Sequence, residues 1–235
     1  MIELQKIKAI SLDLDDTLWP IWPVIERAEK MLLVWLRQHA PQTAALFASP
    51  AALRDIREYV ATELVKTKPE IQHDLSAIRR ESIRLALSRA GNSPALAEPA
   101  FDVFFAERNK VELYGDALPA LQAMAVKYPL VALSNGNASV HTVGLGEYFK
   151  AALSASVFGV GKPDPRIFHA AADAVGVQSH EVLHIGDDAS LDVLGGIAAG
   201  MQTVWLNREE KLYPHDKRPT VEVGTLAEVC AMLGC

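Results

Sequence analysis

Five side chains of this sequence stand where they could do chemistry together. Asp13 and Asp15 directly follow one apolar segment, and Ser134 and Asp187 lie at the ends of two others. Lys162 stands between a glycine and a proline. Carboxylates that share a crevice raise one another's pKa unless a cation offsets their charge. If the fold gathers these residues, they predict a divalent-cation site with an ammonium group beside it.

Mg²⁺ is the cation that suits this group, because all the candidate ligands are oxygens and no His or Cys adjoins them. Ser134 offers a hydroxyl, and Asn135-Gly136 is a turn sequence whose backbone N–H groups can point at anionic oxygens. Lys162 adds a point charge. A site with one metal ion, one ammonium and several N–H donors is suited to a phosphoryl group.

The elements that must position these residues are strands alternating with helices. This alternation is typical of an α/β fold, a doubly wound parallel sheet with a Rossmann-like core and helices on both faces. Ligands bind such a sheet beyond the carboxyl ends of its strands, where the polar residues named above fall. The sequence predicts strands within 6–15 and near 130–134, 152–158, 181–187, 202–207 and 220–223, and helices near 116–127, 165–176, 190–200 and 226–233.

A long helical segment interrupts this alternation after the first strand. A crossover between parallel strands needs a dozen residues or more, whereas about a hundred separate the first strand from the next unit. We therefore predict an α/β catalytic core of residues 1–17 and 114–235, with a helical cap domain inserted over 18–113. Four amphipathic helices are expected in that segment, at 24–40, 51–67, 74–91 and 94–113.

The composition excludes several classes of protein. The chain has 235 residues, half of them hydrophobic, and a formal net charge of −6 without a basic tract, which argues against nucleic acid or anionic membrane as a partner. Cys230 and Cys235 lie outside any metal-ligand spacing. No leader pattern and no long apolar run are visible, so we expect a cytoplasmic protein. We expect it to be a monomer or homodimer.

Four short motifs, taken in order, resemble those of the haloacid dehalogenase-like hydrolase superfamily. They are DLDDTLW at 13–19, Ser134-Asn135-Gly136, Lys162-Pro163 and GDDASLD at 186–192. The helical segment also falls where members with the first type of cap carry their insertion. The resemblance implies a Mg²⁺-dependent phosphatase of small phosphorylated metabolites.

The resemblance implies a role for each aspartate of the motifs. Asp13 would be the nucleophile that forms an aspartyl-phosphate, and Asp15 would protonate the leaving alcohol and then activate water. The Asp13 carboxylate, the Asp15 backbone carbonyl and Asp187 would hold the metal, supported by Asp188 or Asp192. Asp188 is equally explained as a helix N-cap.

The remaining motif residues would handle the phosphoryl group. Ser134, Asn135, Gly136 and Lys162 would bind its oxygens, with Lys162 also acting in catalysis. Thr17, grouped with the substrate-binding residues, is expected to steady the loop that follows the first strand.

The reaction and substrate stay open between several alternatives. Members that remove halide from carbon lack a counterpart of Asp15, so its presence favours phosphomonoester hydrolysis. A phosphomutase and a non-catalytic binding protein on the same fold are the other possibilities. The segments at 69–75, 134–149 and 184–196 are similar to a bacterial branch that acts on 5-amino-6-(5-phospho-D-ribitylamino)uracil, a riboflavin precursor, and on FMN.

Some residues have two interpretations. Trp19 and Trp22 either stack on a substrate ring or pack in the interior. His73 either contacts substrate or starts a helix. His184, inside a strand, is expected to be a satisfied core residue, and the charged run at 208–218 a solvated loop.

Overall fold

The computed structural model describes residues 2–235. Its contacts divide the chain into two compact units: the N-terminal residues through Pro20 with Glu112–Cys235, and Ile21–Val111. The predicted bounds of the helical segment, 18–113, are similar to those of the second unit. The functional assignment of these units as catalytic core and cap stays a prediction.

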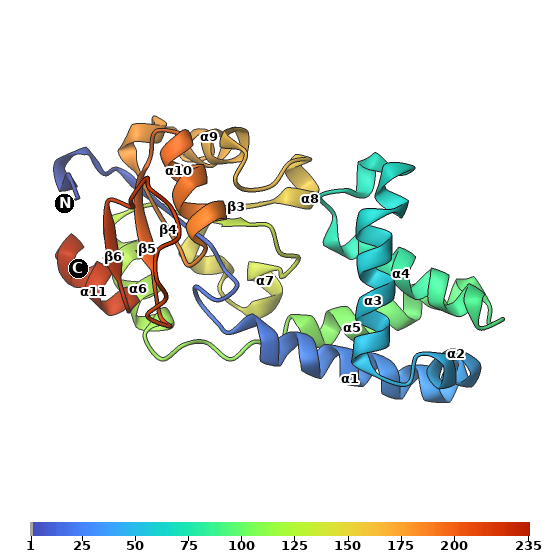
Figure 1. Cartoon of the computed structure of the whole chain (residues 1–235). Coiled ribbons are helices and arrows are strands. Elements are labelled where there is room, and N and C mark those ends of the chain that lie inside the picture. Colours follow the sequence, from blue (N-terminus) through green and yellow to red (C-terminus); the bar gives the residue numbers. More distant parts are fainter. Residues whose placement is uncertain (1) are drawn as a thin grey trace. The chain divides into compact units, whose positions relative to one another are not determined.

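The first unit is built on a six-stranded sheet in which every pairing is parallel (Figure 1). The strand order is β3-β2-β1-β4-β5-β6. This arrangement confirms the predicted doubly wound α/β fold. The strands are β1 (Ala9–Leu12), β2 (Leu130–Ser134), β3 (Phe149–Ser154), β4 (Val182–Gly186), β5 (Gln202–Leu206) and β6 (Val221–Val223).

Strand β1 lies at the point where the strand order reverses. It pairs with β2 on one side and β4 on the other, with Leu12 opposite both Ala132 and Ile185. All four of its residues are buried, as expected for a central strand covered on both faces. The Asp13 N–H continues the pairing by donating to the Ile185 carbonyl at 2.9 Å. The chain therefore enters the crevice beyond the sheet at a residue whose backbone is still held by the sheet.

Helices cover both faces of this sheet. Figure 1 shows α6 and α11 on one side and α9 and α10 on the other. Ile167 and Phe168 of α9 pack in a buried cluster with Ala9, Val131 and Leu133 of the sheet. The helices of this unit are α6 (Ala117–Lys127), α7 (Val140–Val143), α8 (Ala155–Phe158), α9 (Pro165–Asp173), α10 (Gly195–Ala198) and α11 (Leu226–Leu233).

The predicted bounds of the third strand, 152–158, are wrong. The strand runs from Phe149 to Ser154, and residues 155–158 form α8. Ser154 lies opposite Ser134, so β2 and β3 end together. The apolar side chain of Val157, which suggested a strand, is 89% exposed. Similarly, the predicted helix at 190–200 is a π-helical turn, Ala189–Leu194, followed by α10.

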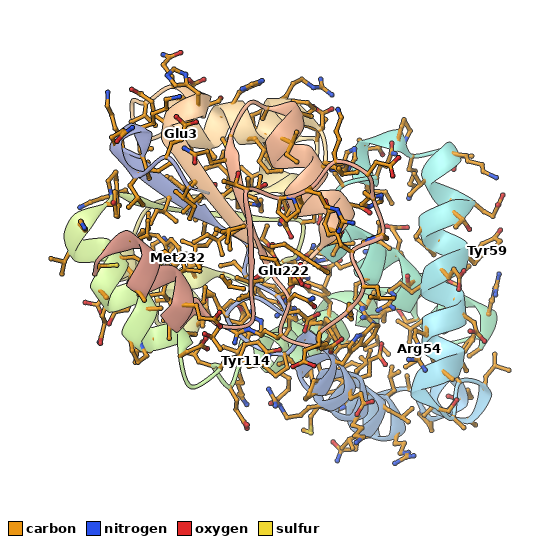
Figure 2. All side chains as sticks on the ribbon, turned by 60° about the vertical axis from the view of Figure 1, so that its left-hand side comes forward. Glu3, Arg54, Tyr59, Tyr114, Glu222 and Met232 are labelled. Atoms are coloured by element: carbon orange, nitrogen blue, oxygen red, sulfur yellow. The ribbon has the colours of Figure 1, made fainter. Side chains whose placement is uncertain are left out.

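Over its described residues, Ile21–Val111, the second unit has no strand and contains five α-helices, one more than the four expected, with three short 3-10 turns between them. The additional element is α2, a short helix that begins at Pro41, where the sequence suggested only a break. Figure 2 shows Arg54 and Tyr59 on α3 of this unit. The helices are α1 (Ile21–His39), α2 (Pro41–Leu46), α3 (Pro50–Thr62), α4 (Leu75–Arg89) and α5 (Ala97–Arg108).

A buried ion pair lies among the apolar side chains of the helical unit. Arg79 of α4 contacts the Glu29 carboxylate of α1 at 3.2 Å, and the Arg79 guanidinium lies 4.0 Å above the Phe104 ring. Arg57 approaches the same carboxylate at 3.6 Å. Burial is the main cause that lowers the pKa of Arg79 to about 10. The Glu29 carboxylate therefore offsets the charge of the buried Arg79 guanidinium.

We expect Glu29→Ala to destabilise the protein by about 3–5 kcal/mol, because it leaves the buried Arg79 without its carboxylate. The matched control is Glu63→Ala, which removes a carboxylate from an exposed pair with Lys66. The control should change stability by no more than about 1 kcal/mol. Urea unfolding followed by circular dichroism measures both. Equal midpoints for the two variants would contradict the importance of the buried pair.

Candidate active site

One pocket, of about 170 Å³, opens where β1, β2 and β4 end. Nearly all of the predicted site residues line it, although they come from four separate stretches of the sequence. This is the grouping that a parallel sheet imposes on residues that follow its strands. The lining residues are Asp13, Asp15, Asp16, Ser134, Asn135, Gly136, Lys162, Asp187, Asp188, Leu191 and Asp192.

The ammonium of Lys162 lies between two carboxylates in the buried part of this pocket. Its Nζ is 2.5 Å from Asp13 Oδ1 and 2.6 Å from Asp192 Oδ1. Only 2% of the Lys162 side chain is exposed. Burial acts to lower the pKa of Lys162, but the two carboxylates raise it above its ordinary value. The residue is therefore a cation held in place by charge-assisted hydrogen bonds.

The pocket carries more negative charge than Lys162 can offset. Burial raises the pKa of Asp13 well above its ordinary value, which the Lys162 ammonium counteracts and the neighbouring carboxylates reinforce. Burial, together with Asp192 and Asp16, raises the pKa of Asp187 to about 7. Carboxylates with raised pKa values in a polar pocket indicate a place for additional positive charge.

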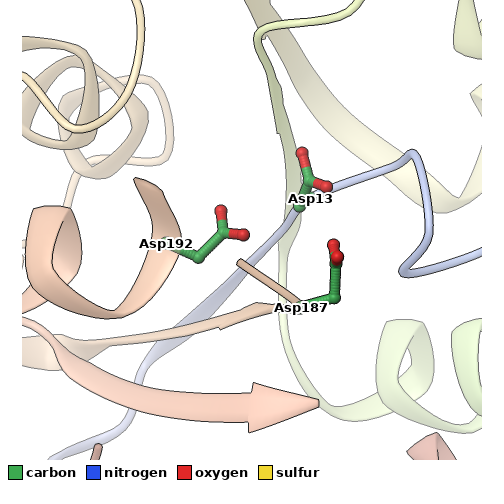
Figure 3. A group of neighbouring side chains, drawn as sticks. All are labelled: Asp13, Asp187 and Asp192. Atoms are coloured by element: carbon green, nitrogen blue, oxygen red, sulfur yellow. The ribbon is translucent and has the colours of Figure 1, made fainter. Parts of the chain in front are cut away.

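Three carboxylates of the pocket lie close enough together to hold a metal ion. Figure 3 shows Asp13, Asp187 and Asp192 side by side, and one oxygen from each lies within 4.8 Å of the other two. A set made only of oxygens, next to a place where a phosphate could bind, fits Mg²⁺. The donor chemistry and the raised pKa values therefore agree with the predicted magnesium site.

Asp187 and Asp192 differ in their hydrogen bonds. Asp192 accepts from Lys162 and from His184 Nε2 on one oxygen, and from the Asp188 N–H on the other. Although burial opposes ionisation, Lys162 and His184 lower the pKa of Asp192 to about 2. Asp187 Oδ1 accepts from Thr17 at 3.2 Å. Asp192 is thus placed to hold Lys162, and Asp187 to offer its carboxylate to a cation.

Asp188, the other residue proposed to support the metal, acts as an N-cap. Its Oδ1 accepts from the backbone N–H groups of Ser190 and Leu191 at 2.7 and 2.8 Å. These are orphan donors of the turn that begins at Ala189. Asp188 is therefore a helix N-cap, and its support of the metal stays a prediction.

Asn135 holds the backbone of Lys162. The Asn135 Nδ2 donates to the Lys162 carbonyl at 2.8 Å, and the Lys162 N–H donates to Asn135 Oδ1 at 2.7 Å. Asn135 also lines the pocket, and its expected contact with phosphoryl oxygens stays a prediction. A Cβ on Gly161 would lie 2.6 Å from Asn135 Oδ1, so this glycine permits the pairing.

Ser134 ends β2 inside the pocket. Its Oγ accepts from the Gly136 N–H at 2.9 Å, which folds the turn back toward the strand. The backbone donor of Gly136, expected to face a phosphoryl group, is thus used by the turn. The Ser134 hydroxyl keeps its own proton available for an anion in the pocket.

The loop after β1 holds Asp15 by its side chain. Trp19 Nε1 donates to Asp15 Oδ1 at 2.8 Å, and the Asp16 N–H donates to the Trp19 carbonyl at 2.7 Å. Trp19 is fully buried, so it packs and donates in the interior and does not stack on a substrate ring. Trp22 is 60% exposed, and its role and that of His73 stay predictions.

Thr17 does not line the pocket, contrary to its grouping with the substrate-binding residues. It is fully buried, and its hydroxyl donates to Asp187. The expectation that Thr17 steadies this loop agrees with that contact, because the hydrogen bond ties the loop to the end of β4.

The sequence missed a residue in the 208–218 run. Arg208 donates both terminal nitrogens to Asp116 and one of them to the Thr17 carbonyl, and it lies 4.0 Å above the Tyr114 ring. It is therefore a structural anchor in part of a run expected to be wholly solvated. No local pattern marks it, because its partners are about 90 and 190 residues away.

His184 is fully buried and satisfied, as expected, but its partner is a site residue. Its Nε2 donates to Asp192 at 3.0 Å. The sequence carries one indication that His184 lies near the site, because alternation along β4 places His184 on the same face as Gly186. A Cβ at Gly186 would lie 2.2 Å from Asp192 Cγ. The glycine thus leaves room for Asp192 directly beside His184.

The haloacid dehalogenase-like hydrolase family matches residues 7–200. The chain is 34% identical to the 5-amino-6-(5-phospho-D-ribitylamino)uracil phosphatase YigB of Escherichia coli, over 98% of each chain. It is also 34% identical to the phosphoserine phosphatase of Thermus thermophilus, over 64% of this chain and 63% of that one.

Two solved structures have a similar fold. A structure described as a 2-haloacid dehalogenase from Pseudomonas syringae pv. tomato superposes with a TM-score of 0.88 at 34% identity, covering 97% of this chain and 98% of that one. A phosphatase from Thermococcus onnurineus shares the fold with a TM-score of 0.66 at 22% identity, over 97% and 98% of the two chains. Within residues 2–235, no helix has the length and apolar character needed to span a bilayer. With the family match covering most of its length, the chain belongs to the haloacid dehalogenase-like hydrolases, and it is an enzyme of that family with phosphatases among its relatives.

Proposed function

We propose that this enzyme is a Mg²⁺-dependent phosphomonoesterase of small phosphorylated metabolites that works through an aspartyl-phosphate on Asp13. The observation that carries the proposal is the buried Asp13–Lys162 contact next to Asp187, in a pocket with more carboxylates than ammonium groups. A nucleophile, a cation for the phosphoryl oxygens and ligands for a metal then lie within one small space.

Asp13 is the nucleophile in this proposal. Its carboxylate oxygen attacks phosphorus, the bond from phosphorus to the ester oxygen breaks, and the phosphoryl group remains on Asp13. Water then attacks the same phosphorus atom and returns the carboxylate. The Asp13 backbone is held by β4 through its N–H, so the attacking group is positioned by the sheet.

Asp15 is the general acid and base. An alkoxide leaving group needs a proton as it departs, whereas a halide ion does not, and Asp15 is placed in the pocket to provide one. The hydrogen bond from Trp19 orients its carboxyl group. This residue supports phosphomonoester hydrolysis over dehalogenation, although one similar solved structure is described as a dehalogenase.

Lys162 and the Ser134 hydroxyl bind the phosphoryl oxygens, and Asn135 sets the backbone position of Lys162. Side chains of Asp13 and Asp187, with the Asp15 carbonyl, would hold Mg²⁺. When bound, the ion supplies the positive charge that lets Asp13 stay ionised beside an anionic substrate.

For the substrate, we infer a phosphorylated ribityl compound, whose ribityl alcohol is the leaving group, on the strength of the full-length relative named for 5-amino-6-(5-phospho-D-ribitylamino)uracil. FMN carries the same type of phosphate ester and belongs in the same substrate panel. Release of inorganic phosphate is the readout, because a phosphomutase would return the group to a sugar and a binding protein would release none.

The nucleophile is tested with Asp13→Asn. We expect phosphate release to fall by at least about 1000-fold, because an amide can neither attack phosphorus nor be regenerated. The control is Asp173→Asn, an exposed aspartate at the end of α9, which should retain activity. A single turnover in ¹⁸O-labelled water adds a second readout. Label only in the released phosphate supports attack at phosphorus, whereas label in Asp13 would indicate an ester hydrolysed at its carbonyl carbon, as dehalogenation requires.

The general acid is tested with Asp15→Asn on two substrates. Hydrolysis of an alkyl phosphate should fall by about 100- to 10,000-fold, because its leaving group needs the proton. Hydrolysis of p-nitrophenyl phosphate should fall much less, since nitrophenolate leaves without one. Trp19→Phe removes the hydrogen bond to Asp15, together with part of a fully buried side chain, and serves as the control for loop position. Equal losses on both substrates would argue against Asp15 as the acid.

Mg²⁺ affinity should depend on pH around neutrality. Because the pKa of Asp187 is raised to about 7, protons compete with the metal below that pH and cease to do so above it. Calorimetric titration should show affinity about tenfold weaker at pH 6 than at pH 8. Asp187→Asn should bind Mg²⁺ more weakly at both pH values, because it removes one of the ligands. An affinity that does not change between pH 6 and 8 would exclude Asp187 as a ligand that must deprotonate.

A further inference from the structure

A continuous chain of buried hydrogen bonds runs from the interior of the sheet to the pocket. Ser11 Oγ lies 2.8 Å from His184 Nδ1, and His184 Nε2 lies 3.0 Å from Asp192 Oδ1. Asp192 contacts Lys162 Nζ, which in turn contacts Asp13. Four successive contacts thus connect the middle of β1 with the residue that follows its end.

The direction of each hydrogen bond follows from Asp192, whose carboxylate lies in the pocket. The ionised Asp192 carboxylate can only accept, so His184 must carry its proton on Nε2. In the neutral ring, Nδ1 is then an acceptor, and the Ser11 hydroxyl donates to it. Ser11 therefore selects the tautomer that lets His184 donate to Asp192.

Both residues are completely buried in the sheet. Ser11 and His184 lie opposite each other on β1 and β4 and have no exposed surface. The edge of the Phe168 ring packs against His184 at 5.0 Å between centroids. Polar groups so placed are costly unless they are paired, and here each is paired with the other or with Asp192. Each side chain of the pair therefore has a hydrogen-bonding role in addition to its packing.

We propose that Ser11 and His184 are positioning residues that hold the Asp192 carboxylate, and through it the Lys162 ammonium, in the geometry needed for phosphoryl transfer. This inference rests on the proposed function of the pocket. Neither residue lines the pocket, so both act through Asp192 and Lys162.

This series of hydrogen bonds affects catalysis because Lys162 is shared between two carboxylates. If Asp192 turns away, Lys162 keeps only its contact with Asp13 and is no longer fixed between the two carboxylates. Loss of the His184 donor should therefore lower kcat more than it raises KM. A role limited to packing would change stability and leave the kcat of the folded enzyme unaltered.

The test compares four variants of the full-length enzyme. His184→Leu removes the donor, and His184→Gln keeps an N–H group near the position of Nε2. Ser11→Ala removes the hydroxyl that selects the tautomer. Thr203→Val is the matched control, because Thr203 lies opposite His184 on β5, and among the described residues its buried hydroxyl is one of the few side-chain groups without a hydrogen-bond partner.

We expect His184→Leu to lower kcat by about 10- to 100-fold with KM changed by less than about threefold. His184→Gln should recover most of this loss, Ser11→Ala should lower kcat by about 3- to 10-fold, and Thr203→Val should match wild type. Full kcat in folded His184→Leu, or equal losses in the Leu and Gln variants, would overturn the proposal.

One further readout separates this inference from the proposed function. Nitrogen NMR of the histidine ring should show a proton on His184 Nε2 and none on Nδ1 in the resting wild-type enzyme, whatever its substrate. If no substrate releases phosphate, the proposed function fails, whereas a proton on His184 Nδ1 in the resting enzyme is the result that would overturn the positioning role.

Discussion

The sharing of one buried ammonium between two carboxylates is the constraint on which the rest of the pocket depends. Lys162 is almost completely buried, so it needs both Asp13 and Asp192 to remain charged there. The contact joins the residue after β1 to the turn after β4, and Asn135 adds β2 by gripping the Lys162 backbone. Three strand ends are thereby fixed around a single cation.

The sheet explains why residues so distant in sequence can meet at that cation. Strand β1 lies between β2 and β4, and the helical unit interrupts the chain after β1 without interrupting the sheet. The residues that follow each strand lie at the same edge of the sheet, and the backbone N–H of Asp13 is still bound to β4 there. Glycine then provides space where side chains must approach closely, as at Gly161 beside Asn135 and Gly186 beside Asp192.

The sequence predicted which residues line the pocket better than what each one contacts. Apolar segments ending in Asp13, Ser134 and Asp187 locate strand ends, and strand ends converge by a general rule. Contacts such as those of Thr17 and Arg208 depend on partners far along the chain, and no local pattern carries that information. The same limit applies to the third strand, where apolar residues at 155–158 suggested burial, although the pairing with β2 ends at Ser154.

Asp187 and Asp192 show how environment divides roles between identical side chains five residues apart. Asp192 receives three hydrogen bonds, one from an ammonium, and its pKa is lowered to about 2. Asp187 has the Thr17 hydroxyl on Oδ1 and lies near other carboxylates, and burial raises its pKa to about 7. The first is ionised whether or not a metal is present, so it can hold Lys162 permanently. The second gains most from an added cation, because its charge is the one that the protein itself leaves least compensated.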